Sequence, residues 1–544
     1  MNGRTAASRL LVVALLGTTG PSTAQTGAPQ RASISASDLR SDVAFLASDD
    51  MRGRLTGSRE NRLAAAFIRA RFERLGLSPV ADDNYLMPFE LIVPAMDRDD
   101  THALNIRVTG EAATQMTLGR DYYPERMSGS TRARGTLVYV GFGVSAPGLD
   151  HNDYASIDVT GRIVVLLNHE PGEFDAGSPF DGRVASEHGR TVRKVLEAQR
   201  RGAVAVLVVA DVHNHENGPT LGALMDATWP AQPGRVPTYE LGAWIDAISI
   251  PVVRISPDVA ARALNETPTG FEALAQRADT DGFTAIAIET EIEVATEITR
   301  RRVTQHNVVG LLDGGDPELR DEWVIMCAHF DHEGANGDRI FNGADDDASG
   351  IAGLLDIAEA YTLAARTGIR PRRSILFAAW NAEERGLLGA WAYTEHPLTP
   401  LSDTVAVLNM DMIGRNEEVP ARGGPRFRGL PAQTAASNRN AVNVLGYSFS
   451  DDLRRAAAAA YAEGLTLHFR YDRSTSNLLR RSDHWPFLAS GVPALFVHTG
   501  LHPDYHTERD RPETLDYEKM ARVVQWVHEL GWNLANADGR PGLN

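Results

Sequence analysis

Histidine and carboxylate side chains gather directly after one apolar segment of the sequence. Residues 323–328 are almost entirely apolar, as in a central strand of a parallel sheet, and His329 and Asp331 follow at once. Three adjacent acids, Asp345 to Asp347, come shortly afterwards. Neighbouring carboxylates repel one another, and a site that needs several of them usually contains a cation. These residues therefore predict a metal centre suited to hydrolytic chemistry.

A simpler interpretation is an acidic turn that caps the following helix. A helix N-cap needs one acceptor, and the helix dipole favours one or two further carboxylates in the first turn. Such a cap accounts for part of the acidic run but leaves His329 and Asp331 unexplained.

The same pattern recurs at three later points in the chain. In open α/β sheets ligands bind at the carboxyl ends of the strands, so residues that follow several strands can meet at one edge. Because four predicted strands end in residues of metal-binding types, a metal site is the leading hypothesis. The further apolar segments and the residues after them are 373–379 with Glu383 and Glu384, 405–409 with Asp411, and 492–497 with His498 and His506.

Five short motifs around these residues resemble the co-catalytic di-zinc exopeptidases, which include bacterial leucyl and Streptomyces-type aminopeptidases, aminopeptidase Y and glutamate carboxypeptidase. The motifs are HFDHEG, GADDDASG, NAEERGLLG, NMDMIG and HPDYHT. The resemblance implies two zinc ions per chain, although histidine and carboxylate ligands also accept cobalt or manganese. It implies that His329 and Asp411 bind one ion, that Glu384 and His506 bind the other, and that Asp346 bridges both.

The resemblance also implies three catalytic roles. Glu383 would be the general base that takes a proton from a metal-bridging water and returns it to the leaving amine. Asp331 would hold the imidazole of His329 in one tautomer. Tyr505 would donate a hydrogen bond to the developing oxyanion, with packing as the alternative.

Other acids and histidines are interpreted as structural. A lone histidine is more often a satisfied polar residue than a ligand. Asp345 and Asp347 are expected to form the turn or to accept hydrogen bonds, and Asp483 and His484 to lie in a buried turn. The histidines not expected to bind metal are His188, His213, His215, His332, His498 and His502.

The composition is that of an ordinary soluble globular protein. The chain has 544 residues, of which 43% are hydrophobic and 23% charged, and 544 residues favour two domains. Its net charge of −17, from 54 basic and 71 acidic residues, argues against a nucleic-acid partner. Peptide substrates are expected instead.

The first 24 residues read as a signal peptide. Arg4 and Arg9 precede an apolar run over 10–16, and small residues follow at 22–24. The run is too short for a stable membrane anchor, so a periplasmic or extracellular location is expected. Cys327 is the only cysteine, which excludes an intramolecular disulfide and fits a small core residue.

The expected fold is α/β, a doubly wound, mostly parallel sheet flanked by helices, with an inserted β-rich domain. Residues 25–118 would begin the peptidase domain and 273–544 complete it. Residues 119–272 carry glycine-punctuated strands that resemble a protease-associated domain, which would shape the active-site entrance and favour short peptides.

Within this fold an aminopeptidase is the preferred function. A carboxypeptidase or dipeptidase would share the metal site but need a basic pocket for the terminal carboxylate. A glutaminyl cyclase with one zinc and a non-catalytic binding module are further alternatives, and the complete ligand set disfavours both. The arginines that could form the basic pocket are Arg415, Arg470, Arg473, Arg480 and Arg481.

Overall fold

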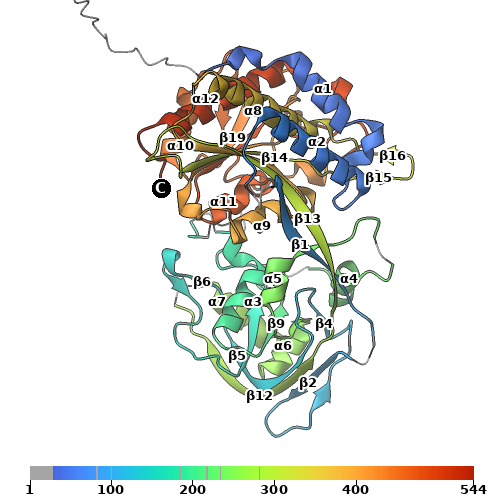
Figure 1. Cartoon of the computed structure of the whole chain (residues 1–544). Coiled ribbons are helices and arrows are strands. Elements are labelled where there is room, and N and C mark those ends of the chain that lie inside the picture. The colour runs from blue at the N-terminus through green and yellow to red at the C-terminus, as the bar shows by residue number, and fades with distance from the viewer. Residues whose placement is uncertain are drawn as a thin grey trace, which may run out of the picture.

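The computed structural model describes residues 28–80, 84–99, 101–175, 177–180, 182, 186–215, 218–232, 234–280 and 282–544. The expected signal peptide, residues 1–24, lies outside the described residues. Two units lie one above the other, and long strands run between them (Figure 1). Among the described residues, no helix combines the length and apolar character needed to cross a membrane.

The upper unit contains a nine-stranded sheet. Its four central strands, β17, β14, β18 and β21, are parallel neighbours, and antiparallel pairs join this group to the strands on either side. In spatial order the strands are β10 (Glu240–Leu241), β1 (Leu86–Ala95), β13 (Thr299–Leu312), β17 (Ser374–Trp380), β14 (Trp323–His329), β18 (Thr404–Met410), β21 (Ala494–His498), β19 (Ala441–Leu445) and β20 (Thr466–Phe469).

Helices cover both faces of this sheet. Alternate residues of a strand point to opposite faces, so in β14 Val324 and Met326 enter one apolar core and Ile325 and Cys327 the other. The first core includes residues of α1 (Ala36–Leu46), α2 (Arg59–Leu75), α8 (Gly350–Arg366) and α12 (Tyr517–Asn536). The second includes residues of α9 (Leu388–Glu395) and α11 (His484–Ala489). The expected α/β fold is confirmed, and Cys327 is buried within it.

The lower unit is built on an eight-stranded sheet with a parallel centre of β5, β8, β9 and β11. In spatial order its strands are β3 (Thr114–Gln115), β2 (Ala103–Arg107), β12 (Ile286–Ala295), β5 (Arg132–Tyr139), β8 (Ile163–Leu167), β9 (Ala205–Val209), β11 (Val252–Ile255) and β4 (Tyr122–Pro124). Its helices include α3 (Thr191–Arg200), α4 (Leu221–Thr228), α5 (Gly242–Ala247), α6 (Pro257–Ala263) and α7 (Pro268–Ala278).

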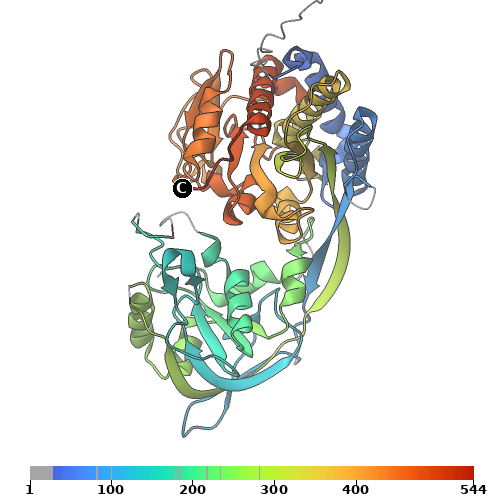
Figure 2. The same ribbon diagram turned by 60° about the vertical axis from the view of Figure 1, so that its left-hand side comes forward.

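The paired strands β1 and β13 connect the two units (Figure 2). The chain leaves the upper unit on β1 and returns on β13, with Ala95 opposite Thr299. The units also pack through side chains: Trp244 of α5 meets Trp391 of α9 edge to face at 5.5 Å, and Glu395 accepts hydrogen bonds from Trp244 and Arg193. The lower unit is therefore tied to the upper one by backbone, apolar and charged contacts.

Candidate metal centre

The carboxyl ends of the four central strands meet at one edge of the upper sheet. His329 is the last residue of β14, and Asp411 directly follows β18. Glu383 and Glu384 begin a short turn after β17, and His506 lies in the loop beyond β21. These strands are adjacent and parallel, so the predicted meeting of four strand ends is confirmed.

Asp346 lies between two groups of side chains. One of its carboxylate oxygens is 3.2 Å from Nε2 of His329, and the other is 3.0 Å from Nε2 of His506. Asp411 approaches the same nitrogen of His329 at 3.7 Å, and Glu384 approaches that of His506 at 3.3 Å. All five residues suggested as metal ligands are thus brought together, with Asp346 shared by the two groups.

The two flanking acids stabilise the turn that presents Asp346. The carboxylate of Asp347 accepts backbone N–H groups of His329 at 3.1 Å and Gly350 at 2.8 Å, which links strand, turn and helix α8. Asp345 accepts the N–H of Gly414 at 2.6 Å. Both are buried and engaged by the backbone, as expected of turn-forming acceptors.

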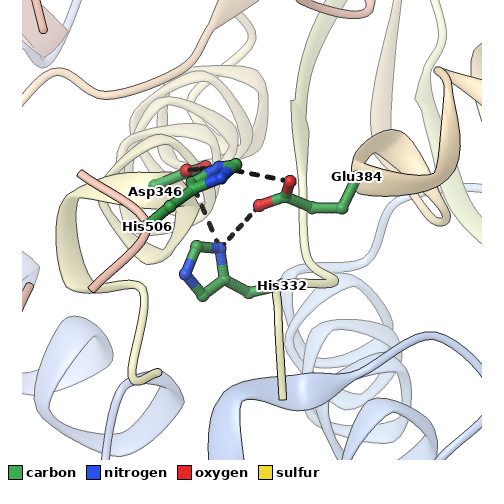
Figure 3. Close-up of side chains that lie close together, drawn as sticks. All are labelled: His332, Asp346, Glu384 and His506. Carbon is green, nitrogen blue, oxygen red and sulfur yellow. Dashed lines mark ion pairs between the residues drawn. The ribbon is translucent and has the colours of Figure 1, made fainter. Parts of the chain in front are cut away.

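His332, which was not expected to bind metal, belongs to the group that contains His506 and Glu384. His332 is fully buried, and its Nδ1 lies 2.7 Å from Oε1 of Glu384 and 3.7 Å from Oδ2 of Asp346 (Figure 3). Its ring meets that of His506 edge to face at 5.6 Å. The available signal was its position in the same HFDH motif as His329.

Gly343 leaves room for the imidazole of His332. Its φ of 60° is a left-handed conformation that suits glycine, and an added Cβ would lie 2.6 Å from the His332 ring. The glycine that opens the GADDDASG motif thus admits His332 to the site.

Asp331 positions the turn that carries Glu383 as well as the imidazole of His329. Its carboxylate accepts the backbone N–H of Glu383 at 3.0 Å and the hydroxyl of Thr56 at 2.8 Å. Nδ1 of His329 lies 3.1 Å from the backbone carbonyl of Asp331 and 3.8 Å from its carboxylate. The expected contact with the imidazole is therefore closer through the backbone, and the carboxylate has a further positioning role.

Tyr505 lies beside His506, in the group that also contains Glu384. Its ring centroid is 3.8 Å from that of His506, and burial raises the pKa of its hydroxyl well above the usual value. The hydroxyl therefore stays protonated and can donate a hydrogen bond.

Burial and neighbouring charges shift the pKa values of the carboxyl groups in the centre. Burial opposes ionisation of Asp346, but the imidazoles of His332, His329 and His506 lower its pKa well below the usual range. Burial raises the pKa of Glu383 well above its usual value, and nearby carboxylates add to the rise. The pKa values of two carboxyl groups in one site are thus shifted in opposite directions. Asp346 favours the anion, and Glu383 favours the protonated form.

A cavity opens onto both groups. Polar side chains of both groups and of their neighbours line it, and four apolar side chains complete the wall. The polar residues are Asp346, Glu383, Asp411, Arg481, His498, Tyr505 and His506, and the apolar ones are Met412, Leu478, Phe496 and Leu501. A ligand in this cavity would contact the carboxylates while its hydrophobic part lies against these side chains.

The side chains fit metal ions better than they fit one another. Nε2 of His329, both ring nitrogens of His332 and Oε1 of Glu384 are buried and make no hydrogen bond of good geometry in the described structure, although Nδ1 of His332 and Oε1 of Glu384 are only 2.7 Å apart. Buried polar atoms are rarely left unsatisfied. His332, His506, Asp346 and Glu384 in one group are a donor set that zinc accepts, and His329 with the carboxylates of Asp411 and Asp346 is another.

Comparison with protein families agrees with this geometry. Residues 307–531 match the model of peptidase family M28, and residues 133–262 match the PA domain, the protease-associated module. The chain carries an M28 peptidase domain with an inserted PA domain. The resemblance inferred from the five motifs is confirmed.

Similar proteins carry several peptidase names. A probable zinc metalloprotease of Leptosphaeria maculans is 29% identical over 48% of this chain and 65% of its own length. A probable glutamate carboxypeptidase of Arabidopsis thaliana is 26% identical over 72% of this chain and 52% of its own length. An aminopeptidase of Mus musculus is 31% identical over 42% of this chain and 30% of its own length. The chain thus spans less than two thirds of each of these relatives.

Among solved structures, the aminopeptidase from Aneurinibacillus sp. strain AM-1 matches with a TM-score of 0.45 and 20% identity. The match covers 94% of this chain and 96% of that one.

Proposed function

We propose that the protein is an exported zinc-dependent exopeptidase that removes N-terminal residues from short peptides. The observation that carries the proposal is the position of Asp346, whose two oxygens face His329 and His506 separately. Such a shared carboxylate suits two neighbouring ions. Export is supported by the basic, apolar and small-residue order of the first 24 residues.

Two ions would be held by two sets of side chains. His329 and Asp411 would hold one, and Glu384, His506 and His332 the other, with Asp346 common to both. Bound zinc supplies Lewis acidity toward the scissile carbonyl and makes water more acidic. Cobalt or manganese would also suit these ligands.

Glu383 is suited to act as the general base. It lines the cavity beside the ligand residues, and burial gives its carboxylate a raised pKa and thus a greater affinity for a proton. It would take a proton from the attacking water and return it to the leaving amine. Asp331 fixes the start of its turn through the backbone N–H of Glu383.

Tyr505 is placed to stabilise the tetrahedral transition state. It lines the same cavity and keeps its hydroxyl proton, so it can donate to an oxygen that becomes negative during attack. The name of the Mus musculus relative, an aminopeptidase, supports the aminopeptidase assignment.

The position of Arg481 supports carboxypeptidase or dipeptidase activity as the alternative function. Among the candidate arginines, Arg415 pairs with Asp504 and Arg470 with Glu417, whereas Arg481 lines the cavity and donates to the backbone carbonyl of Ser476. A guanidinium in the cavity could bind a terminal carboxylate.

A matched set of substrates separates these functions. We would measure metal content together with hydrolysis of an aminoacyl chromogenic amide, an N-blocked dipeptide with a free carboxylate, and an N-terminal glutaminyl peptide. Two zinc ions per chain with cleavage of the free-amine substrate alone is expected. Cleavage of the blocked dipeptide alone would establish a carboxypeptidase, and cyclisation with one zinc a glutaminyl cyclase. Metal-free, inactive protein would leave a binding module.

A further inference from the structure

A second cluster of metal-binding residue types lies in the inserted unit. His169 and Glu173 follow β8, and His215 follows β9, the neighbouring parallel strand. One ring nitrogen of each histidine and one carboxylate oxygen of Glu173 lie within 4.8 Å of one another. This unit is the lower one in Figure 2, whereas the strand ends that form the candidate metal centre belong to the upper one. The hydrolytic reaction proposed above uses none of the three residues.

Both imidazoles face the carboxylate of Glu173. Nδ1 of His169 lies 3.3 Å from one oxygen, and Nε2 of His215 lies 2.8 Å from the other. The two rings are stacked, with centroids 4.3 Å apart. Donor atoms bound to zinc at about 2.0–2.1 Å in tetrahedral geometry lie roughly 3.3 Å apart. The contact between His169 and Glu173 already has this spacing, and the 2.8 Å contact between His215 and Glu173 would lengthen slightly to admit an ion.

The backbone around His169 is held in an uncommon conformation. His169 has a φ of 64°, a left-handed value that residues other than glycine seldom adopt. The buried amine of Lys194 donates to the carbonyls of Leu167 at 2.7 Å and His169 at 2.6 Å. These bonds fix the direction in which His169 leaves β8.

One further carboxylate joins the two loops. Asp279, just after α7, accepts the backbone N–H of Gly172 at 2.6 Å through one oxygen and the side-chain amide of Asn214 at 3.3 Å through the other. Asp211 accepts the same amide at 2.8 Å, and its carbonyl accepts the N–H of His215 at 3.0 Å. The loops are therefore positioned by contacts that do not involve the side chains of the three candidate ligands.

We propose that His169, Glu173 and His215 bind one divalent transition-metal ion of the zinc type, as a structural clip between the loops after β8 and β9. Two imidazoles and a carboxylate are a set that zinc accepts, with a fourth position left for water. Partial exposure of all three side chains gives an ion access from solvent, because His169, Glu173 and His215 are 35%, 14% and 32% exposed. The clip would stabilise the inserted unit without entering the hydrolytic reaction.

The experiment compares the full-length protein with Glu173→Gln and His215→Asn, each saturated with zinc and freed of excess ion. His213→Asn is the matched control, because His213 lies on the same loop outside the cluster. Metal content per chain and the melting temperature with and without zinc are measured, together with hydrolysis of a short peptide.

The wild-type protein and the control are expected to carry one zinc more than either variant. Zinc should also raise their melting temperature further than it raises that of the variants, while peptide hydrolysis stays the same in all four proteins. Equal zinc content in wild type, Glu173→Gln and His215→Asn would overturn the proposal and leave a hydrogen-bonded trio. All four proteins keep the residues of the candidate metal centre, and the test is the difference in zinc content between them. Its result therefore does not depend on whether the protein is a peptidase.

Discussion

The carboxylate of Asp331 accepts the backbone N–H of Glu383 at 3.0 Å. This bond links the loop after β14 to the turn after β17, which carries both the proposed base and a proposed ligand. The distance between Glu383 and the ligand residues therefore depends on a buried carboxylate that touches neither proposed ion.

Asp331→Ala is expected to lower kcat by about 10- to 100-fold, as for other residues that orient metal ligands. The turn would lose its fixed point while the ligand side chains remain. Steady-state kinetics with metal analysis checks this, with Thr56→Val as the control that removes only the second hydrogen bond to Asp331. A change in KM alone would contradict the positioning role.

Glu383→Gln should retain both ions and the fold but lose about 10²- to 10⁴-fold in kcat, because an amide cannot carry the proton. The partner variant Glu384→Gln should instead lose metal from the His506 side. Metal loss from Glu383→Gln would show that the two glutamates have the opposite roles.

Much of the centre could be predicted because it follows strand ends. His329, Asp411 and Glu384 are close to the ends of apolar segments, so the sequence placed them along one edge before any contact was known. His332 and His169 also follow strand ends closely, but a strand end does not show which donors a loop residue will meet. Their positions depend on contacts distant in sequence, such as that of Gly343 with the His332 ring or Asp279 with Gly172.

The role of Asp331 was also only partly predictable. Its spacing from His329 suggested a bond between side chains, but the tight turn after β14 turns the backbone carbonyl toward the imidazole. The carboxylate is then free to reach Thr56 and Glu383, which belong to segments far away in the chain.

Asp346→Ala should release both ions together, because the two groups share this carboxylate. Isothermal titration with zinc should then show neither of the tight sites of the wild-type centre. The exposed loop acid Asp338 provides a control, and Asp338→Ala should bind as the wild type does. One tightly held ion remaining at the centre in Asp346→Ala would argue against a bridging carboxylate.

His332→Ala should weaken the ion on the His506 side by about 10- to 100-fold and leave the ion beside His329 in place. Competition with a chelator, followed by metal analysis, measures the two losses separately. The exposed His396→Ala is the control. Equal retention of both ions in wild type and His332→Ala would mean that His332 only packs against Glu384.

Asp356→Asn should stabilise the protein at neutral pH. Asp356 on α8 is buried, and burial together with the nearby Asp42 raises its pKa to about 8, above the ordinary 3.8. Its folded-state pKa is raised, so its contribution to stability is fully present below pH 3.8 and is lost as the pH rises toward 8. Asparagine removes this loss.

At pH 8 the free energy of unfolding should rise by at least about 1 kcal/mol in Asp356→Asn, with little gain at pH 4. Urea unfolding at both pH values measures the difference. Glu359→Gln, less than one turn further along α8 and partly exposed, is the control and should show a smaller effect. A gain that does not change with pH would contradict the titration of Asp356.

The ribbon of β1 and β13 has a consequence for how such a protein could arise. Because Ala95 and Thr299 are opposite each other, a tight turn at that point would close the ribbon into an ordinary hairpin, and the upper sheet would keep every strand except the short β10. The topology therefore allows a whole module to be gained or lost at one hairpin tip. Packing opposes that exchange, because excision would expose Trp391 and the apolar face beside it to water. Insertion or excision at this tip leaves the backbone pairing of β1 and β13 intact. A stable protein without the module would need new polar residues on α9.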